Sequence, residues 1–198
     1  MMPATVRRPS AITSDQLWML MRHLRDYAGI KIDSSQAIIS QCIKQRMASL
    51  GITDVDAYLA AFDASINARA EWMALIDLLT VKETRFFRQP EAFDCVANYV
   101  ETLLQQGPAP SALSFWSAGC SAGQEAYSLG MVIEHILRRH QPWLQWHGIG
   151  TDISFEAISA AQQASYPGDA LRHVPADYRK WYMAQESGGQ WTVSANIK

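Results

Sequence analysis

The segment from residue 113 to about 165 most constrains the fold, because its apolar pattern changes repeatedly between strand and helix. Leu113 to Trp116 is a short apolar run typical of a buried strand, and a run of small residues follows it. The predicted elements are a strand at 113–116, a helix at 125–139, a strand at 146–151 and a helix at about 154–164. This strand–helix–strand–helix order predicts a parallel, doubly wound sheet.

The first 80 residues carry helical patterns and no strand pattern. Four helices are expected at about 14–28, 33–50, 55–64 and 68–79. In the first helix, Leu17, Leu20 and Leu24 recur at the spacing of one helical face, and Ser14 or Asp15 is expected to cap its start. These patterns predict a small helical domain ahead of the sheet.

The second helix is expected to start at Asp33–Ser34 and to end at Gly51. Its buried side is expected to hold Ile38, Ile39, Cys42, Ile43, Met47 and Leu50. A further helix is predicted at about 91–106, and Trp191–Val193 is expected to begin another strand. The predicted organisation is a flexible arm at 1–12, a helical domain at 13–80 and a sheet-containing domain at 81–198.

Composition excludes several classes of function. The 198 residues suit one ordinary domain or two small ones, and a net charge of −2 argues against nucleic-acid binding by bulk electrostatics. No apolar stretch is long enough to cross a membrane or to form a signal peptide. The three cysteines, Cys42, Cys95 and Cys120, lack metal-ligand spacing, so we expect no metal, no disulfide framework and a cytoplasmic location.

The small residues at 117–123 lie between the first strand and its helix, where α/β sheets bind nucleotide-type cofactors. They do not match the spacing of the dinucleotide fingerprint, and a tight turn without a ligand explains them equally well. Asp152, at the end of the second strand, can accept hydrogen bonds from both hydroxyls of a ribose. The alternative is that Asp152 caps the next helix, a role that Ser154 could also fill.

A hydrolase is a competing, less favoured interpretation. Gly119, Ser121 and Gly123 match the G-x-S-x-G pattern of a nucleophile elbow, and Asp152 and His173 follow in the required order. However, one strand at most precedes the elbow, and no His-Gly-Gly-type oxyanion loop lies upstream. We expect His173 to lie on the surface.

Three segments together resemble the CheR family of methyltransferases, which modify bacterial chemoreceptors. Residues 84–88 (TRFFR) resemble its T-x-F-F-R junction. Residues 115–129 (FWSAGCSAGQEAYSL) resemble its W-S-A-G-C-S-T-G-E-E-P-Y-S-L motif, and 150–154 (GTDIS) resemble its T-D-I segment. The motifs occur in the family's order, behind a small helical domain, and the resemblance covers most of residues 15–195.

The resemblance implies a helical, receptor-recognising domain followed by a Rossmann-like domain that uses S-adenosylmethionine and releases S-adenosylhomocysteine. The implied substrate is a glutamate side chain in the cytoplasmic domain of a chemoreceptor. The implied cofactor contacts are Lys82, Thr84, Arg88, Gly119, Glu125 and Asp152. Of these, Thr84 and Arg88 would meet the methionine end, Glu125 the amino group and Asp152 the ribose, and Arg88 would lie near the reacting centre.

Such chemistry needs few protein groups. A glutamate carboxylate is ionised at neutral pH and needs no general base. The enzyme has to hold the carboxylate and the methyl group in near-attack geometry and exclude water. Arg88 could orient a carboxylate by a bidentate contact.

The chain departs from the family in several places. The family usually has Asn at Lys82, two acidic residues at 124–125 and Pro at Ala126. The family's later N-L strand and F-D-x-I-x-C-R-N-V motif are absent, so we expect an incomplete sheet whose open edge pairs with a second copy or exchanges elements with it.

The family's receptor-binding helix is basic, whereas the second helix here offers only Lys44 and Arg46, expected to be solvated. A non-catalytic receptor-binding module therefore remains an alternative.

Overall fold

The computed structural model describes residues 12–29, 35–64, 68–80, 82–106 and 110–198. The chain divides into two compact units, one up to Val81 and one from Lys82 to Lys198. Most of the expected arm at 1–12 and the expected helix start at Asp33–Ser34 lie outside the described residues. No helix in the described ranges is long and apolar enough to cross a membrane.

The first unit consists of helices. They are α1 (Ser14–Ala28), α2 (Gln36–Leu50), α3 (Val55–Ala64) and α4 (Ala68–Leu79). Thr13, rather than the expected Ser14 or Asp15, caps α1: its hydroxyl accepts from the N–H of Gln16, while the Gln16 side chain accepts from the N–H of Thr13. Gly29 and Gly51 end α1 and α2 in the left-handed conformation, as predicted.

The core of the first unit lies among these four helices. Its largest fully buried side chains include Leu20, Leu24, Ile43, Met47, Tyr58, Leu75 and Ile76. The prediction for α2 was wrong at two positions, since Ile38 is 56% exposed and Leu50 is 42% exposed. Both residues lie near the ends of the helix. There, an apolar side chain is buried only if a neighbouring helix reaches it, which the residue type does not reveal.

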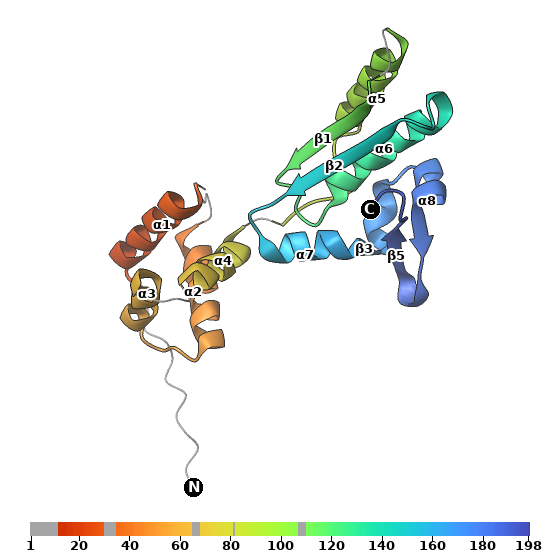
Figure 1. Ribbon diagram of the computed structural model, residues 1–198. Helices are drawn as coiled ribbons and strands as arrows, with labels where there is room; N and C mark the ends of the chain where they lie inside the picture. Colours follow the sequence, from red (N-terminus) through yellow and green to blue (C-terminus); the bar gives the residue numbers. More distant parts are fainter. Residues whose placement is uncertain (1–11, 30–34, 65–67, 81, 107–109) are drawn as a thin grey trace. The chain divides into compact units, whose positions relative to one another are not determined.

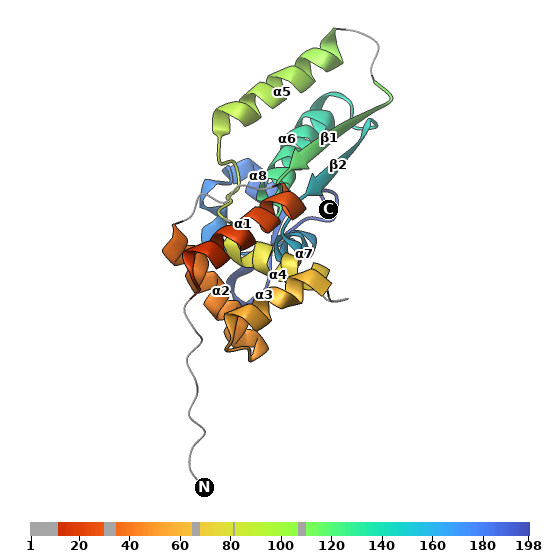
Figure 2. The same ribbon diagram turned by 90° about the vertical axis from the view of Figure 1, so that its left-hand side faces the viewer.

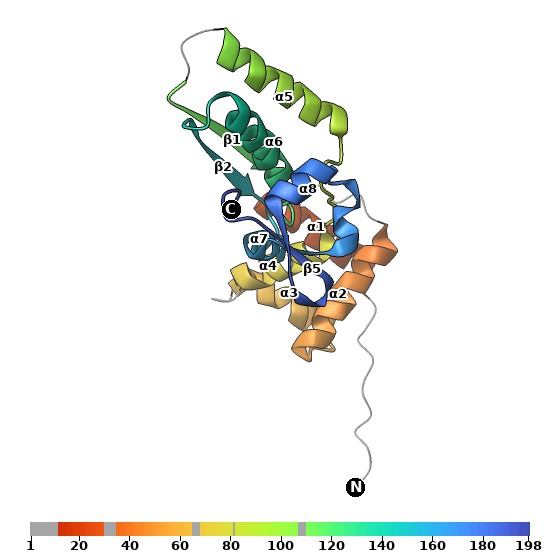
Figure 3. The same ribbon diagram turned by 90° about the vertical axis from the view of Figure 1, so that its right-hand side faces the viewer.

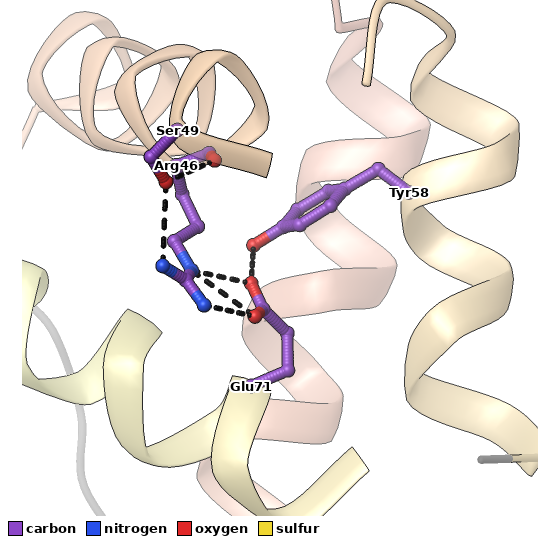
Figure 4. Close-up of polar contacts among 4 residues, drawn as sticks. All are labelled: Arg46, Ser49, Tyr58 and Glu71. Carbon is purple, nitrogen blue, oxygen red and sulfur yellow. Dashed lines mark hydrogen bonds and ion pairs between the residues drawn. The ribbon is translucent and has the colours of Figure 1, made fainter. Parts of the chain in front are cut away.

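A largely buried ion pair joins α2 and α4 in the first unit (Figure 4). Glu71 on α4 is 7% exposed and accepts from Arg46 on α2, with 2.7 Å between Nη2 and Oε2. Tyr58 on α3 donates its hydroxyl to the other carboxylate oxygen at 2.8 Å. Burial, and then this hydrogen bond, raise the pKa of Tyr58 well above its usual range, so the hydroxyl stays a donor. Arg46 is therefore not the solvated cation that the sequence suggested.

The first helix of the second unit is α5 (Pro90–Gln105), and it is followed by β1 (Ala112–Ala118), α6 (Gln124–His140), β2 (Gln145–Thr151) and α7 (Phe155–Gln163). Strands β1 and β2 pair in parallel, from Ala112 opposite Gln145 to Ala118 opposite Thr151. Helix α6 lies between α5 and the strand pair (Figures 2 and 3). Packing is close enough that a Cβ on Gly130 would lie 2.8 Å from the Trp146 ring. The predicted helix-plus-α/β fold class is confirmed.

The chain then forms a small antiparallel sheet that the sequence did not predict (Figure 1). Its strands are β3 (Ser165–Pro167), β4 (Met183–Gln185) and β5 (Gln190–Val193), with β5 in the middle. Between β3 and β4 lie the 3-10 helix η1 (Gly168–His173) and α8 (Ala176–Tyr182), and η2 (Ser187–Gly189) precedes β5. The strand expected at Trp191–Val193 is present, but it does not extend the parallel sheet.

We predict that Glu71→Gln lowers the stability of the first unit by about 3 kcal/mol, the lower end for a broken buried ion pair, because Arg46 keeps some contact with water. The variant removes the charge that Arg46 and Tyr58 surround. The measurement is the free energy of opening of α2 and α4 from amide hydrogen exchange. Asp26→Asn is the control, because its pair with Arg22 is exposed and should change the free energy by less than about 1 kcal/mol. Equal losses in the two variants would contradict the prediction.

Candidate functional site

The loop after β1 and the end of β2 are joined through their backbones. The N–H groups of Gly119 and Cys120 both donate to the carbonyl oxygen of Thr151, at 2.7 and 2.9 Å. Three residues of this loop, Gly119, Ser121 and Gly123, have positive φ values of 75°, 49° and 91°. A loop with this backbone presents its amides and small side chains at the carboxyl ends of the two strands, where α/β domains bind ligands.

Gly123, which precedes α6, is required by both conformation and space. A Cβ at this position would lie 2.9 Å from the Tyr127 ring and 3.0 Å from the Cβ of Ala161 on α7. The glycine thus allows α6 and α7 to approach at the loop. By contrast, apart from Gly119 and its two chain neighbours, no atom of the described residues lies within 4 Å of the place that a Cβ would occupy on Gly119, so the backbone there is open to a ligand.

Asp152 ties three elements together. One carboxylate oxygen accepts from the N–H of Ser121 in the β1 loop at 2.7 Å, and the other accepts from the N–H of Ser154 at 2.8 Å. The side-chain cap of α7 is Ser154, whose hydroxyl accepts from the N–H of Ala157 at 3.0 Å. Asp152 is therefore free of the capping role; the residue is half-buried, and a carboxylate oxygen that accepts one hydrogen bond keeps a lone pair for a further donor.

Glu125 lies in the first turn of α6, beside the same loop. Its Oε1 accepts from the hydroxyl of Ser117 at 2.7 Å, and the side chain is exposed. The helix N-terminus stabilises its negative charge. Glu125 and Asp152 thus place two carboxylates at the carboxyl ends of β1 and β2, where they can accept hydrogen bonds or face a cation.

Residues 82–88 are attached to the second unit by two phenylalanines. Phe86 is buried edge-on against Tyr166, with 4.9 Å between ring centroids, and Phe87 packs on Phe93 at 5.1 Å. The N–H of Phe87 also donates to the hydroxyl of Ser128 on α6 at 3.2 Å. The packed aromatics therefore fix this segment to the core of the second unit.

The polar side chains of the same segment face outward. Arg88 is exposed and donates to the carbonyl oxygen of Glu83 at 3.3 Å, and Thr84 is half-buried. Lys82 forms an ion pair with Glu156 in the first turn of α7. Sequence reasoning missed this pair and the Ser117–Glu125 contact, because no spacing along the chain signals either.

The hydrolase alternative gains no support. Ser121 has the positive φ of a strained turn, but its buried hydroxyl oxygen has no hydrogen-bond partner among the described residues. His173 is exposed at the end of η1. Burial, and then the charge of Asp152, raise the pKa of the neighbouring Cys120 thiol, so it is not an activated nucleophile either.

A cavity of about 410 Å³ lies on the side of the sheet that faces α6 and α7. Its lining includes Phe115, Tyr127, Trp146, Ile158 and Ile197, and contains no Asp or Glu side chain among the described residues. A ligand that needs hydrogen-bond acceptors for hydroxyl or amino groups is better served at the strand ends, where Glu125 and Asp152 lie. We therefore place the candidate site there.

Comparison with known proteins shows the family to which the second unit is similar. Residues 82–198 match the family model described as the CheR methyltransferase SAM-binding domain. The chain is 25% identical over 194 residues to a chemotaxis protein methyltransferase of Borreliella burgdorferi, which covers 94% of this chain and 67% of the relative. It is 27% identical over 158 residues to that of Escherichia coli, covering 79% of this chain and 52% of the relative.

Another relative bears a different name. The chain is 32% identical over 162 residues to a probable biofilm formation methyltransferase, WspC, of Pseudomonas putida, covering 81% of this chain and 37% of the relative. This chain thus spans between about a third and two thirds of the length of these curated relatives.

We predict that Asp152→Asn destabilises the second unit by about 1–3 kcal/mol, because an amide nitrogen would then face one of the two N–H donors and leave it unsatisfied. Two measurements check this: the midpoint of urea denaturation for the whole unit, and the rate of amide hydrogen exchange in the 117–123 loop. Asp169→Asn is a matched control, since Asp169 is exposed on η1. An equal midpoint for both variants would show that Asp152 does not hold the loop.

Proposed function

The chain belongs to the CheR methyltransferase family, and on this basis we propose that it methylates glutamate side chains of a chemoreceptor-like protein in a bacterial chemosensory pathway. The cofactor of the matched domain is S-adenosylmethionine. The observation that carries the proposal is the pair of carboxylates, Glu125 and Asp152, on either side of an open glycine loop. The proposed partner is the cytoplasmic domain of a receptor, reached from the cytoplasm.

The residues present fit this cofactor. Its ribose carries two hydroxyl donors and its amino group is cationic, so both ends require acceptors of the kind that Asp152 and Glu125 provide. Gly119 leaves room for close approach of the backbone. We propose that Asp152 binds the ribose, Glu125 binds the amino group, and Thr84 and Arg88 meet the methionine end.

S-adenosylmethionine supplies an electrophilic methyl group on a cationic sulfur. In the proposed reaction, Arg88 holds the receptor's glutamate by a charge-assisted contact, and the ionised carboxylate needs no base. The contribution of the protein is orientation and exclusion of water at the strand ends. If the chain binds cofactor and receptor without turnover, it acts instead as a receptor-binding module.

We also propose that the parallel sheet pairs with a second copy of the chain, or exchanges elements with it, through an open strand edge beside its uncovered face. The outward-facing residues of β1 and β2 are all exposed, and they include Trp116 at 70% and Ile149 at 58%. Neither strand has a second neighbour within the described residues. Open edges beside exposed apolar side chains favour pairing with another strand.

Cofactor binding can be tested by calorimetric titration of S-adenosylhomocysteine into the chain. We expect binding, and we expect Glu125→Gln to weaken it about tenfold or more, since a hydrogen bond to a charged group is worth roughly 1.5–3 kcal/mol. Glutamine retains an oxygen that can accept from Ser117, so the loop should keep its structure. Glu91→Gln, in the first turn of α5, is the matched control. Absence of binding by the unaltered chain would contradict the proposed function.

Self-association can be tested by light scattering over a range of concentrations. We expect a concentration-dependent dimer, and we expect Trp116→Lys to shift it to monomer because a charge then lies on the sheet face. Trp143→Lys is the control, because Trp143 is 74% exposed but lies outside the sheet. A monomer at every concentration, or equal effects of both changes, would refute the proposed interface.

A further inference from the structure

The ion pair between Lys82 and Glu156 links the start of the second unit to α7. Lys82 precedes Thr84 and Arg88, whereas Glu156 lies in the first turn of α7. The side chains of Lys82 and Glu156 are 36% and 72% exposed, so neither charge is buried in a way that would require a partner. The pair connects residues that are 74 positions apart in the sequence. Its effect is therefore to hold the start of the second unit against α7.

The same turn of α7 is connected to the candidate site. Glu156 follows Ser154 by two residues, and the N–H of Ser154 donates to Asp152. Asp152 in turn accepts from the N–H of Ser121 in the glycine loop. The position of Lys82 is thus coupled, through α7, to the carboxylate proposed to bind the ribose.

The other end of the segment is fixed independently. Phe86 and Phe87 are buried in the core of the second unit, and Ser128 accepts from the N–H of Phe87. With Lys82 held by Glu156, the intervening residues are restrained at both ends. A segment ordered before binding loses less conformational entropy when the ligand arrives, and so it binds more tightly.

We infer that Lys82 is a positioning residue: it favours cofactor binding by holding residues 82–88 against α7 through Glu156, and it does not itself touch the cofactor. This inference rests on the proposed function, because it assigns Lys82 a role at the same site. It differs from the direct contact that the family resemblance implied for Lys82. An ammonium group paired with a carboxylate also adds no net positive charge beside a cationic cofactor.

The test is a charge-exchange cycle of Lys82→Glu, Glu156→Lys and the double variant, each titrated with S-adenosylhomocysteine. Exposed ion pairs of this kind change an equilibrium by about two- to fivefold. We expect each single variant to weaken binding by at least that factor, and the double variant to bind within twofold of the unaltered chain. Arg22→Glu, which breaks an exposed pair on α1, should have no effect.

A direct contact predicts another pattern. If Lys82 touches the cofactor, the double variant will bind no better than Lys82→Glu, and the inference is wrong. It is equally wrong if both single variants bind normally. Titrations with S-adenosylmethionine should repeat the same ratios, because a positioning effect does not depend on the charge of the sulfur.

Hydrogen exchange of residues 82–89 in the free chain separates this inference from the proposed function. We expect faster exchange in each single variant and restored protection in the double variant. If the unaltered chain binds no cofactor, the proposed function fails, whereas unchanged exchange in the single variants would refute the positioning role by itself.

Discussion

The carboxylate of Asp152 is the contact on which the candidate site depends. Its two oxygens receive N–H groups from the β1 loop and from the residue that caps α7, at 2.7 and 2.8 Å. The Ser121 N–H belongs to a loop with three positive φ values within five residues, which the Thr151 carbonyl oxygen also holds through Gly119 and Cys120. The end of β2, the glycine loop and the start of α7 therefore meet at this carboxylate. A ligand that binds Asp152 would contact the group that joins all three elements.

The sequence predicted the long elements well, because their ends carry local signals. Gly29 and Gly51 end two helices and Ser154 caps a third, each by a backbone or side-chain effect confined to a few residues. The antiparallel sheet of β3, β4 and β5 was missed, because strands of three or four residues are too short for a periodic pattern. Ile38 and Leu50 were assigned to the core wrongly, since exposure at helix ends is decided by tertiary neighbours.

The candidate site was predictable in its residue types and not in its contacts. Asp152 could be proposed because it ends a predicted strand, whereas Glu125 was implied by the resemblance to the CheR family. Their partners could not, since Ser121 N–H, Ser154 N–H and the Ser117 hydroxyl meet them only after the loop has folded. Backbone donors in particular leave no mark in the identity of the residue.

Arg46 illustrates how a tertiary contact changes the meaning of a charge. On the sequence it was one of two cations on the second helix, and it was expected to be solvated. In the structure its guanidinium is committed to Glu71, and Lys44 is half-buried. Helix α2 therefore presents few free cations, whereas Arg88 lies exposed in the segment beside the candidate site, where Lys82 is paired with Glu156. Recognition of a partner by α2 would therefore depend on shape and apolar contact, to which the exposed Ile38 and Leu50 contribute.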